Sequence, residues 1–404
     1  MTFDESTDEF RAFVRGWLHE HAEPYRHDVV VGRGPSDLPA AREFMALMHA
    51  AGLNGLTWPL DAGGAGRGDV DAQTFRDETA QYTLPLDPFR IGMGTVGPTI
   101  VDMGTEAQRR LLCPAILSGD SIWCQLFSEP DAGTDLAGLR TSAVRDDGGF
   151  RITGRKVWNT NAHRADYGVA LVRTEPDAPK HQGITMMLVD MHAEGVTVSP
   201  LRDMTGNAVF NEVVLDQAFV PDGMVLGEIN DGWRIAGRML THERGAVSSG
   251  VGTDGKATEA VSYPNVAALW HKHGDPADDA AITALVDYYV EHEALSLLRA
   301  RYAQLAHDGL SGPVDHSVSK LLIGRANVDA AERATRILGS VAVYEDPAVE
   351  KAILSAPALS IAGGTEEIQK NIIAERGLGL PRESDPSKTM TFREIIAHNR
   401  QQGS

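Results

Sequence analysis

The sequence has few cysteines, no long apolar run and no excess of basic residues. Its 2 cysteines, Cys113 and Cys124, are too few for a disulfide framework or a zinc-ligand cluster, and they fit a reducing, cytoplasmic compartment. No apolar run approaches the roughly 18 residues that a membrane span needs, and the acidic start MTFDESTDEF predicts no signal peptide. A formal net charge of −19 argues against nucleic acid as a partner, because nucleic-acid binding needs a basic face.

The length and composition of the chain are sufficient for more than one hydrophobic core. The chain has 404 residues, of which 42% are hydrophobic and 23% charged, as in soluble globular proteins. Apolar residues recur at helical spacing in residues 1–118, for example at Phe10, Val14 and Leu18. We therefore expect an α+β fold with an N-terminal all-α domain (1–118), a small middle β domain (119–229) and a C-terminal α-helical domain (230–404).

The pattern inside the last two regions predicts individual elements. Short β-branched runs bounded by turn residues predict strands at 167–172, 184–189, 196–198 and 212–215, and Asp146-Asp147-Gly148-Gly149 predicts a hairpin turn. Apolar stripes predict helices at 282–307, 317–338 and 366–376. The segment 250–255 matches G-x-G-x-x-G but lacks the preceding strand that a dinucleotide site needs, so we interpret it as a flexible loop.

One unusual loop, Gln125–Thr134 (QLFSEPDAGT), combines polar groups with a tight turn. Pro130 keeps the preceding residue out of the helical region, and Gly133 has no Cβ to keep a ligand away. Ser128 and Thr134 supply hydroxyl groups, and Gln125 supplies an amide. These groups suit a flat heterocycle with polar edges, but an ordinary polar surface turn has the same composition.

A second segment, Thr153-Gly154-Arg155-Lys156-Val157-Trp158-Asn159-Thr160-Asn161, sets one tryptophan among hydroxyl and amide side chains. Together the two segments resemble the flavin-binding loop and strand of the acyl-CoA dehydrogenase family. The resemblance continues through Thr57-Trp58-Pro59 and Gly63–Gly66 to 363–370 and 379–381, and so spans nearly the whole chain.

The resemblance implies FAD as the cofactor. It places eight residues around the isoalloxazine and ribityl chain: Gln125, Leu126, Phe127, Ser128, Gly133, Thr134, Trp158 and Thr160. Thr134 is also expected near the thioester arm of the substrate, and Trp158 has an ordinary core aromatic as its alternative. The family holds the adenine end of FAD with a neighbouring subunit, and the matching residues here are Arg336, Gly339, Ser340, Thr365 and Glu367.

Two departures from the family pattern lie at that adenine end. The family usually has glutamine where Arg336 stands, and its Arg-x-x-Phe-Gly element is absent after residue 250. Arg336 is either a replacement for the missing positive charge or a helix-surface arginine.

The most informative departure concerns the catalytic base. Many family members carry it as the Glu of a Tyr-Glu-Gly-Thr motif, but this chain has Ala362-Gly363-Gly364-Thr365 there. Another branch, which includes isovaleryl- and long-chain-type enzymes, places the Glu on an earlier helix before an arginine, as in Thr241-His242-Glu243-Arg244. The resemblance therefore implies Glu243 as the base, with Thr241, Thr134, Arg244, Gly363 and Gly364 contacting the substrate. A Glu-Arg pair on a solvated helix face is the alternative.

The implied function is FAD-dependent α,β-dehydrogenation of an acyl-CoA to a trans-2-enoyl-CoA in lipid β-oxidation. The small residues Ala362 and Gly363 favour a branched or bulky acyl group. The expected partners are an electron-transferring flavoprotein and either further copies of this chain, in a dimer or tetramer, or a sister chain in a heterotetramer. A structural partner subunit that has lost catalysis remains the alternative, and a flavoenzyme for a non-CoA substrate such as a nitroalkane is a third possibility.

Overall fold

The computed structural model describes residues 7–26, 37–248, 260–310, 312, 314–344, 346–384 and 389–402. The chain forms two compact units. Unit 1 comprises Met1–Leu201, Ala208–His242 and Pro386–Ser404, and unit 2 comprises Arg202–Asn207 and Glu243–Asp385. The predicted loop at 250–255 lies outside the described residues.

Unit 1 begins with helices that bury one face each. In the first helix Phe10, Val14, Trp17 and Leu18 are buried, as their helical spacing predicts. A buried carboxylate, Glu78, joins the first and third helices by accepting from Arg11 and Arg15 at 2.8 and 2.7 Å. These helices are α1 (Thr7–His21), α2 (Leu38–Ala50), α3 (Asp69–Thr79), α4 (Gly97–Met103) and α5 (Glu106–Ser118).

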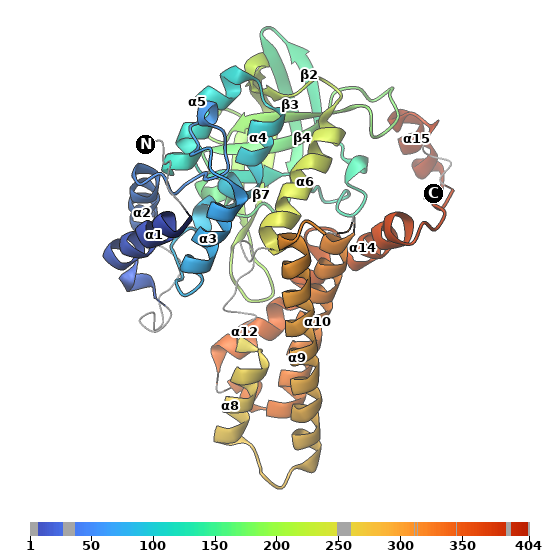
Figure 1. Cartoon of the computed structure of the whole chain (residues 1–404). Coiled ribbons are helices and arrows are strands. Elements are labelled where there is room, and N and C mark those ends of the chain that lie inside the picture. The colour runs from blue at the N-terminus through green and yellow to red at the C-terminus, as the bar shows by residue number, and fades with distance from the viewer. Residues whose placement is uncertain are drawn as a thin grey trace. The chain divides into compact units, whose positions relative to one another are not determined.

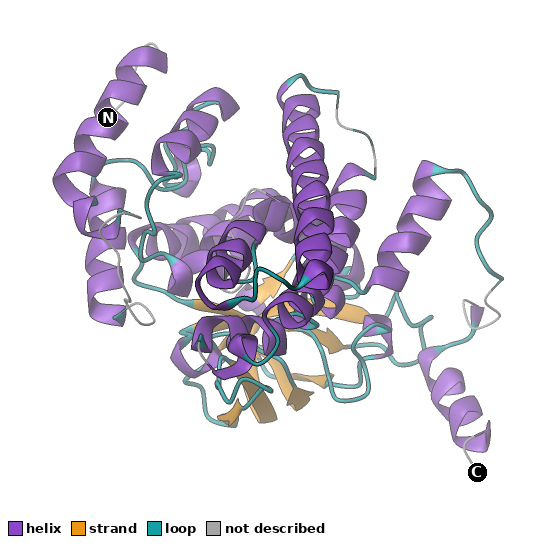
Figure 2. Cartoon of the chain, turned by 90° about the horizontal axis from the view of Figure 1, so that it is seen from below, coloured by secondary structure: helices purple, strands orange, loops and turns teal. Residues whose placement is uncertain are grey.

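An 8-stranded sheet follows in the same unit, with the order β6-β7-β3-β2-β4-β5-β8 and with β1 paired in parallel to β4. Its strands gather into one layer (Figure 2). They are β1 (Trp123–Leu126), β2 (Ser142–Asp146), β3 (Gly149–Lys156), β4 (Tyr167–Arg173), β5 (Ile184–Asp190), β6 (Val196–Leu201), β7 (Phe210–Pro221) and β8 (Val225–Leu226).

The central strand β4 is buried on both faces. Val169 and Leu171 belong to a core shared with α4 and α5, whereas Ala170 and Val172 belong to a second core with Phe150 and other strand residues. Successive side chains of a strand point to opposite faces, so a strand between two cores reads as a continuous apolar run.

Unit 2 is helical, and its two longest helices, α9 and α10, run side by side (Figure 1). Leu285 and Tyr288 of α9 pack with Ala334 and Ile337 of α10 in its core. Its helices are α8 (Tyr263–His273), α9 (Asp279–His307), α10 (Asp315–Leu338), α11 (Val341–Tyr344), α12 (Pro347–Ser355), α13 (Ala358–Ile361) and α14 (Glu366–Ile372). Helix α6 (Gly232–Ser248) continues from unit 1 into unit 2, and α15 (Phe392–Gln402) belongs to unit 1. None of the described helices has both the length and the apolar character to cross a bilayer.

Candidate functional site

The two motif segments predicted to bind flavin lie side by side in unit 1. Gln125 and Leu126 end strand β1, and Trp158 and Thr160 follow strand β3. The amide of Val157 donates to the carbonyl of Ser128 at 2.9 Å, and Asn159 Nδ2 donates to the carbonyl of Gln125 at 2.7 Å. Stretches separated by about thirty positions in the sequence therefore form one surface.

A buried ion pair fixes this surface from below. Lys156 Nζ donates to Glu129 Oε1 at 2.8 Å and to the carbonyls of Phe127 and Leu171 at 3.0 and 2.8 Å. Glu129 also accepts from the amides of Arg140 and Thr141 at 2.7 and 2.9 Å. Both residues belong to the family motif, but sequence reasoning assigned neither a role.

The pKa shifts of Glu129 and Lys156 agree with this buried ion pair. Burial alone would raise the pKa of Glu129, but the Lys156 ammonium and the donors at Thr141 and Arg140 outweigh it and hold the pKa below its usual value. Burial lowers the pKa of Lys156, against the opposing effect of Glu129. A buried pair with every partner supplied holds the loop in one geometry.

Trp158 has an unusual backbone and an unusual exposure. Its φ is 64°, in the left-handed region that non-glycine residues seldom occupy, and its side chain is 57% exposed. Its only described ring contact is an edge-on one with Phe210, at 5.7 Å between ring centroids. Hydrogen bonds on both sides, at Val157 and Asn159, impose this conformation. Strain of this kind is typical of ligand-binding positions.

The loop after Phe127 leaves room above its glycine. Among the described residues, none lies within 4 Å of a Cβ added at Gly133. Thr134 beside it is exposed, whereas Ala132 is buried in the core. The described part of the chain therefore leaves space beside Gly133. Among the other predicted residues, Leu126 and Phe127 are buried, while Gln125, Ser128 and Thr160 are half-buried.

Helix α6, which carries the predicted base, is anchored to α4 by a carboxylate that the sequence did not single out. Asp102 Oδ2 accepts from Arg238 Nε at 2.6 Å and contacts His242 Nε2 at 2.9 Å. Thr241 is exposed and donates to the carbonyl of Gly237 at 3.0 Å. Arg244 lies in the same helix, and its side chain is outside the described part of the structure.

In unit 2, Glu243 lies beside the vacant family position. A Cβ added at Gly363 would be 3.6 Å from Glu243 Oε1. The carboxylate thus ends next to the position at which many proteins of the family that this chain resembles carry a Glu. The turn has φ values of 67° at Gly363 and 89° at Gly364, and the buried Gln369 fixes it by donating to the two glycine carbonyls at 3.2 and 3.4 Å.

The residues predicted for the adenine end fall into two groups along unit 2. Arg336, Gly339 and Ser340 are exposed at the C-terminal end of α10. Thr365 caps α14, and its neighbour Glu366 accepts from Arg325 Nε at 3.1 Å. Arg336 follows Arg325 by eleven positions, or about 16 Å at the usual helical rise. The two groups therefore lie well apart on one copy of the chain.

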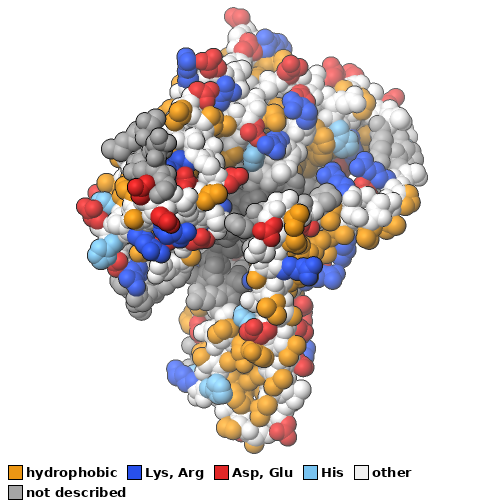
Figure 3. Space-filling view, in the orientation of Figure 1, with side chains coloured by type: hydrophobic (Ala, Val, Ile, Leu, Met, Phe, Trp, Pro, Cys, Tyr) orange, Lys and Arg blue, Asp and Glu red, His pale blue; other side chains and the backbone are white. Residues whose placement is uncertain are grey.

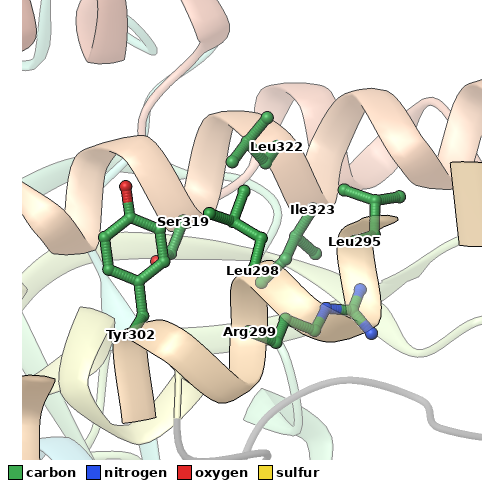
Figure 4. A pocket seen from close by; sticks show the side chains of 7 residues that line it. All are labelled: Leu295, Leu298, Arg299, Tyr302, Ser319, Leu322 and Ile323. Carbon is green, nitrogen blue, oxygen red and sulfur yellow. The ribbon is translucent and has the colours of Figure 1, made fainter. Parts of the chain in front are cut away.

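A small pocket between α9 and α10 includes none of the predicted site residues (Figure 4). Its free space is about 20 Å³, enough for roughly one water molecule. We therefore regard it as a packing gap. It is lined by Leu295, Leu298, Arg299, Tyr302, Ser319, Leu322 and Ile323.

Models of the N-terminal, middle and C-terminal domains of acyl-CoA dehydrogenase match residues 4–120, 124–218 and 230–378. The chain belongs to the acyl-CoA dehydrogenase family. The predicted α+β fold, the enzyme class and the FAD cofactor are thereby confirmed.

Relatives of known name agree with this assignment. Acyl-CoA dehydrogenase FadE34 of Mycobacterium tuberculosis is 41% identical over 345 residues, which are 85% of this chain and 47% of FadE34. The chain thus spans about half the length of that relative. Acyl-CoA dehydrogenase IpdE1 of the same organism is 34% identical over 94% of this chain and 99% of its own length.

Two solved structures share the fold along nearly the whole chain. The Tcur3481-Tcur3483 steroid ACAD has a TM-score of 0.75, and the ChsE4-ChsE5 complex from Mycobacterium tuberculosis has 0.74. Each is 30% identical and covers 95% of this chain and 100% of the matched chain.

The surface described above fits an isoalloxazine. A flat ring needs an aromatic or open surface and polar groups at its edges, and an exposed indole, open space at Gly133 and the hydroxyl-bearing Ser128, Thr134 and Thr160 provide these. A surface strained at Trp158 and clamped at Glu129 is preorganised for such a ring.

Proposed function

We propose that the chain oxidises a bulky acyl-CoA thioester to its trans-2-enoyl-CoA, with Glu243 as the base. The observation that carries this proposal is the 3.6 Å between Glu243 Oε1 and the Cβ position at Gly363. A carboxylate on another helix lies near the position of the missing motif Glu, and this supports Glu243 as its replacement.

The roles of the other residues follow from the chemistry. Bound FAD supplies the acceptor for the β-hydride. Glu243 takes the α-proton, and the amide of Gly363 donates to the thioester oxygen as negative charge develops there. Gln125–Ser128, Gly133, Thr134, Trp158 and Thr160 hold the flavin ring and ribityl chain. Thr241, Arg244 and Gly364 contact the CoA thioester.

The proposed substrate carries a branched or ring-bearing acyl group. Ala362 and Gly363 stand where many family members have Tyr and Glu, and the loss of these two large side chains would enlarge the acyl side. The Tcur3481-Tcur3483 steroid ACAD matches 95% of this chain, and this similarity favours an acyl group that carries a steroid-sized ring system.

Anaerobic bleaching of the bound flavin tests this proposal. In its assembled form the protein should be yellow and should bleach with a steroid-bearing or branched acyl-CoA faster than with butyryl-CoA. Best activity with butyryl-CoA would refute the bulky substrate class, and the absence of bleaching with every acyl-CoA would refute the enzymatic role.

We further propose that the chain assembles with a second chain of the family. The two groups of adenine-end residues lie about 16 Å apart along α10, which fits contributions to two different cofactors. FadE34 is about twice as long as the region it shares with this chain, and two matched structures are named for pairs of proteins. A sister chain in a heterotetramer is thus favoured over a homo-oligomer.

An apolar stripe on α9 supports assembly. Ile282, Val286, Tyr289, Val290 and Leu297 are between 37% and 70% exposed and share one face of the helix. Figure 3 shows hydrophobic side chains gathered over the lower helices of unit 2. Analytical ultracentrifugation of the chain alone would test this assembly, because a stable homotetramer would contradict the need for a sister chain.

The alternative function is a structural partner subunit that completes a sister chain's flavin site. Arg336 and the missing Arg-x-x-Phe-Gly element favour it, because both alter the adenine end. In that case Glu243→Gln would leave the activity of the assembled complex unchanged, whereas the enzymatic proposal expects that activity to be lost.

A further inference from the structure

Arg173, the last residue of β4, is a buried cation whose described hydrogen bonds go to backbone carbonyls. Its side chain donates to the carbonyls of Ala137 and Lys180 at 2.7 and 2.6 Å, with Leu139 at 3.4 Å. The residue is only 4% exposed. Burial lowers its pKa to about 10, so the guanidinium is charged at neutral pH. A buried charge of this kind needs compensation from its surroundings.

The C-terminal helix provides part of that compensation. The guanidinium carbon of Arg173 lies 3.9 Å from the ring centroid of Phe392, the first residue of α15, and Phe392 is 7% exposed. A cation over the face of a desolvated aromatic ring is favourably placed. No argument from the sequence pointed to Phe392.

Backbone contacts hold the start of α15 in this position. The amide of Phe392 donates to the carbonyl of Ala178 at 2.9 Å, and that of Arg393 donates to the carbonyl of Pro176 at 3.0 Å. Arg393 Nε also contacts Asp177 Oδ1 at 2.7 Å. The turn after β4 and the start of α15 thus form one packed element of unit 1.

On its other side Arg173 holds the loop predicted to bind flavin. Ala137 lies three residues after Thr134, in the helical turn Leu136–Gly138. Asp135 of the same loop accepts from Lys180 Nζ at 3.0 Å. The exposed residues Gly133 and Thr134 therefore lie between two anchors, the Glu129–Lys156 pair and the Arg173 group.

We propose that α15 is a positioning element of the flavin loop. Phe392 holds the Arg173 guanidinium, the guanidinium holds the carbonyls of Ala137 and Leu139, and this chain of contacts sets the position of Thr134. The C-terminal helix thereby controls FAD affinity from more than 250 positions away in the sequence. The proposal rests on the assignment of Gln125–Thr134 to the cofactor.

The test uses substitutions that change the contact between Phe392 and Arg173 and leave the rest of helix α15 unchanged. Phe392→Leu keeps apolar volume but loses the aromatic face, Phe392→Tyr keeps the face, and Arg173→Lys keeps the charge but loses the fork of donors. Asn399→Ala, at an exposed position on the same helix, is the matched control. The readouts are the FAD dissociation constant of the apoprotein, from flavin fluorescence, and the rate of tryptic cleavage after Arg140, which is exposed and follows the end of the loop at Thr134.

We expect Phe392→Leu and Arg173→Lys to raise the dissociation constant about tenfold and to accelerate cleavage after Arg140. Phe392→Tyr and Asn399→Ala should match the unmodified protein. Unchanged FAD affinity in both Phe392→Leu and Arg173→Lys, or an equal loss in Asn399→Ala, would overturn the proposal.

A further variant separates this proposal from the site assignment on which it rests. If Trp158→Ala weakens FAD binding while Phe392→Leu and Arg173→Lys do not, the role of α15 is wrong and the site assignment stands. If Trp158→Ala also leaves FAD binding unchanged, the site assignment fails together with the role of α15.

Discussion

Lys156 and Glu129 form an ion pair in which the lysine side chain is 0% and the glutamate side chain 8% exposed. The pair joins the end of strand β3 to the loop after β1, and it does so with every described donor of Lys156 directed at an oxygen atom. The geometry of the candidate flavin surface therefore depends on a contact that lies entirely beneath it.

Removing one partner of the Lys156–Glu129 pair should lower the free energy of unfolding. Lys156→Met leaves the Glu129 carboxylate buried without its cation, and we expect a loss of about 3–5 kcal/mol in the free energy of unfolding. Urea unfolding would measure it. The exposed pair of Arg151 and Asp146 offers the control, because Asp146→Asn should change stability little. Equal losses of stability in Lys156→Met and Asp146→Asn would contradict the role of the buried ion pair.

Glu129 should also make stability depend on pH. The pKa of Glu129 in the folded chain lies below its usual 4.5, so as the pH falls below about 4.5 the unfolded chain binds the proton first. The stability due to the ionised carboxylate is therefore complete above that pH and is lost as the pH falls through the folded-state pKa. Glu129→Gln should lower stability at pH 7 and give a shallower decline between pH 5 and 3 in thermal unfolding.

Glu243→Gln should abolish most of the flavin reduction without affecting binding. The amide keeps the shape and removes the basicity, and a positioned base contributes about 10²–10⁴-fold to the rate. Stopped-flow bleaching measures the rate, and flavin absorbance and acyl-CoA titration confirm binding. Glu350→Gln, on the exposed face of α12, is the control. If Glu243→Gln bleaches at the rate of the unmodified protein, another residue is the base, and Glu366 and Glu367 are the next residues to test.

Gly363→Ala should restrict the substrate range. Both Gly363 and Gly379 have a φ of 67°. An added Cβ would contact Glu243 at Gly363, but no described residue lies within 4 Å of one at Gly379. Each alanine should therefore cost roughly 1–2 kcal/mol in stability from backbone strain. Only Gly363→Ala should slow bulky acyl-CoAs more than butyryl-CoA in steady-state assays, and Gly363→Glu should do so more strongly. The same selectivity in Gly379→Ala would indicate a general structural effect.

FAD retention should depend on assembly. If a neighbouring chain holds the adenine end through Arg336–Ser340, dilution to monomer should release the cofactor, and Arg336→Ala should weaken FAD binding by about tenfold. Fluorescence of released flavin, followed beside light scattering, would measure both. Lys351→Ala, another exposed cation of unit 2, is the control. Full FAD retention in a demonstrated monomer would rule out this arrangement.

Electrons should leave to an electron-transferring flavoprotein in preference to oxygen. Closing the site over a bound thioester excludes water and with it dissolved oxygen. Turnover with bulky acyl-CoA should reduce the flavoprotein acceptor while producing little hydrogen peroxide. Rapid peroxide formation would identify an oxidase.

Elements with a strong local pattern could be predicted from the sequence. The stripe at 282–307 lies within α9 (Asp279–His307), and the apolar run at 167–172 lies within β4 (Tyr167–Arg173). Strand β7 was predicted only at 212–215 but runs over Phe210–Pro221, because its outer residues alternate too weakly to stand out before their neighbours in the sheet are known. Strands β1 and β8 are 4 and 2 residues long, too short for a periodic signal.

The candidate site also has features that the sequence motifs could predict and features that they could not. The motifs predicted roles for Trp158 and Glu243 from residue type and order, and these roles stay predictions. The motifs could not show the left-handed backbone of Trp158, the carboxylate of Asp102 at α6, or the ring of Phe392 on Arg173. Each of these depends on segments brought together only by folding, and a contact between distant positions leaves no periodic trace in one sequence.

Trp158 is held at a φ of 64° even though its side chain is 57% exposed. Such a backbone costs the chain on the order of 1–3 kcal/mol, and so exposed a ring returns little of it through burial. Glycine accepts this conformation freely, so Trp158→Gly should make the cofactor-free chain melt at a higher temperature while it loses its hold on the flavin. A screen that selects variants for thermal stability alone would therefore replace Trp158. The selected variants would have a higher melting temperature but would bind the flavin less tightly.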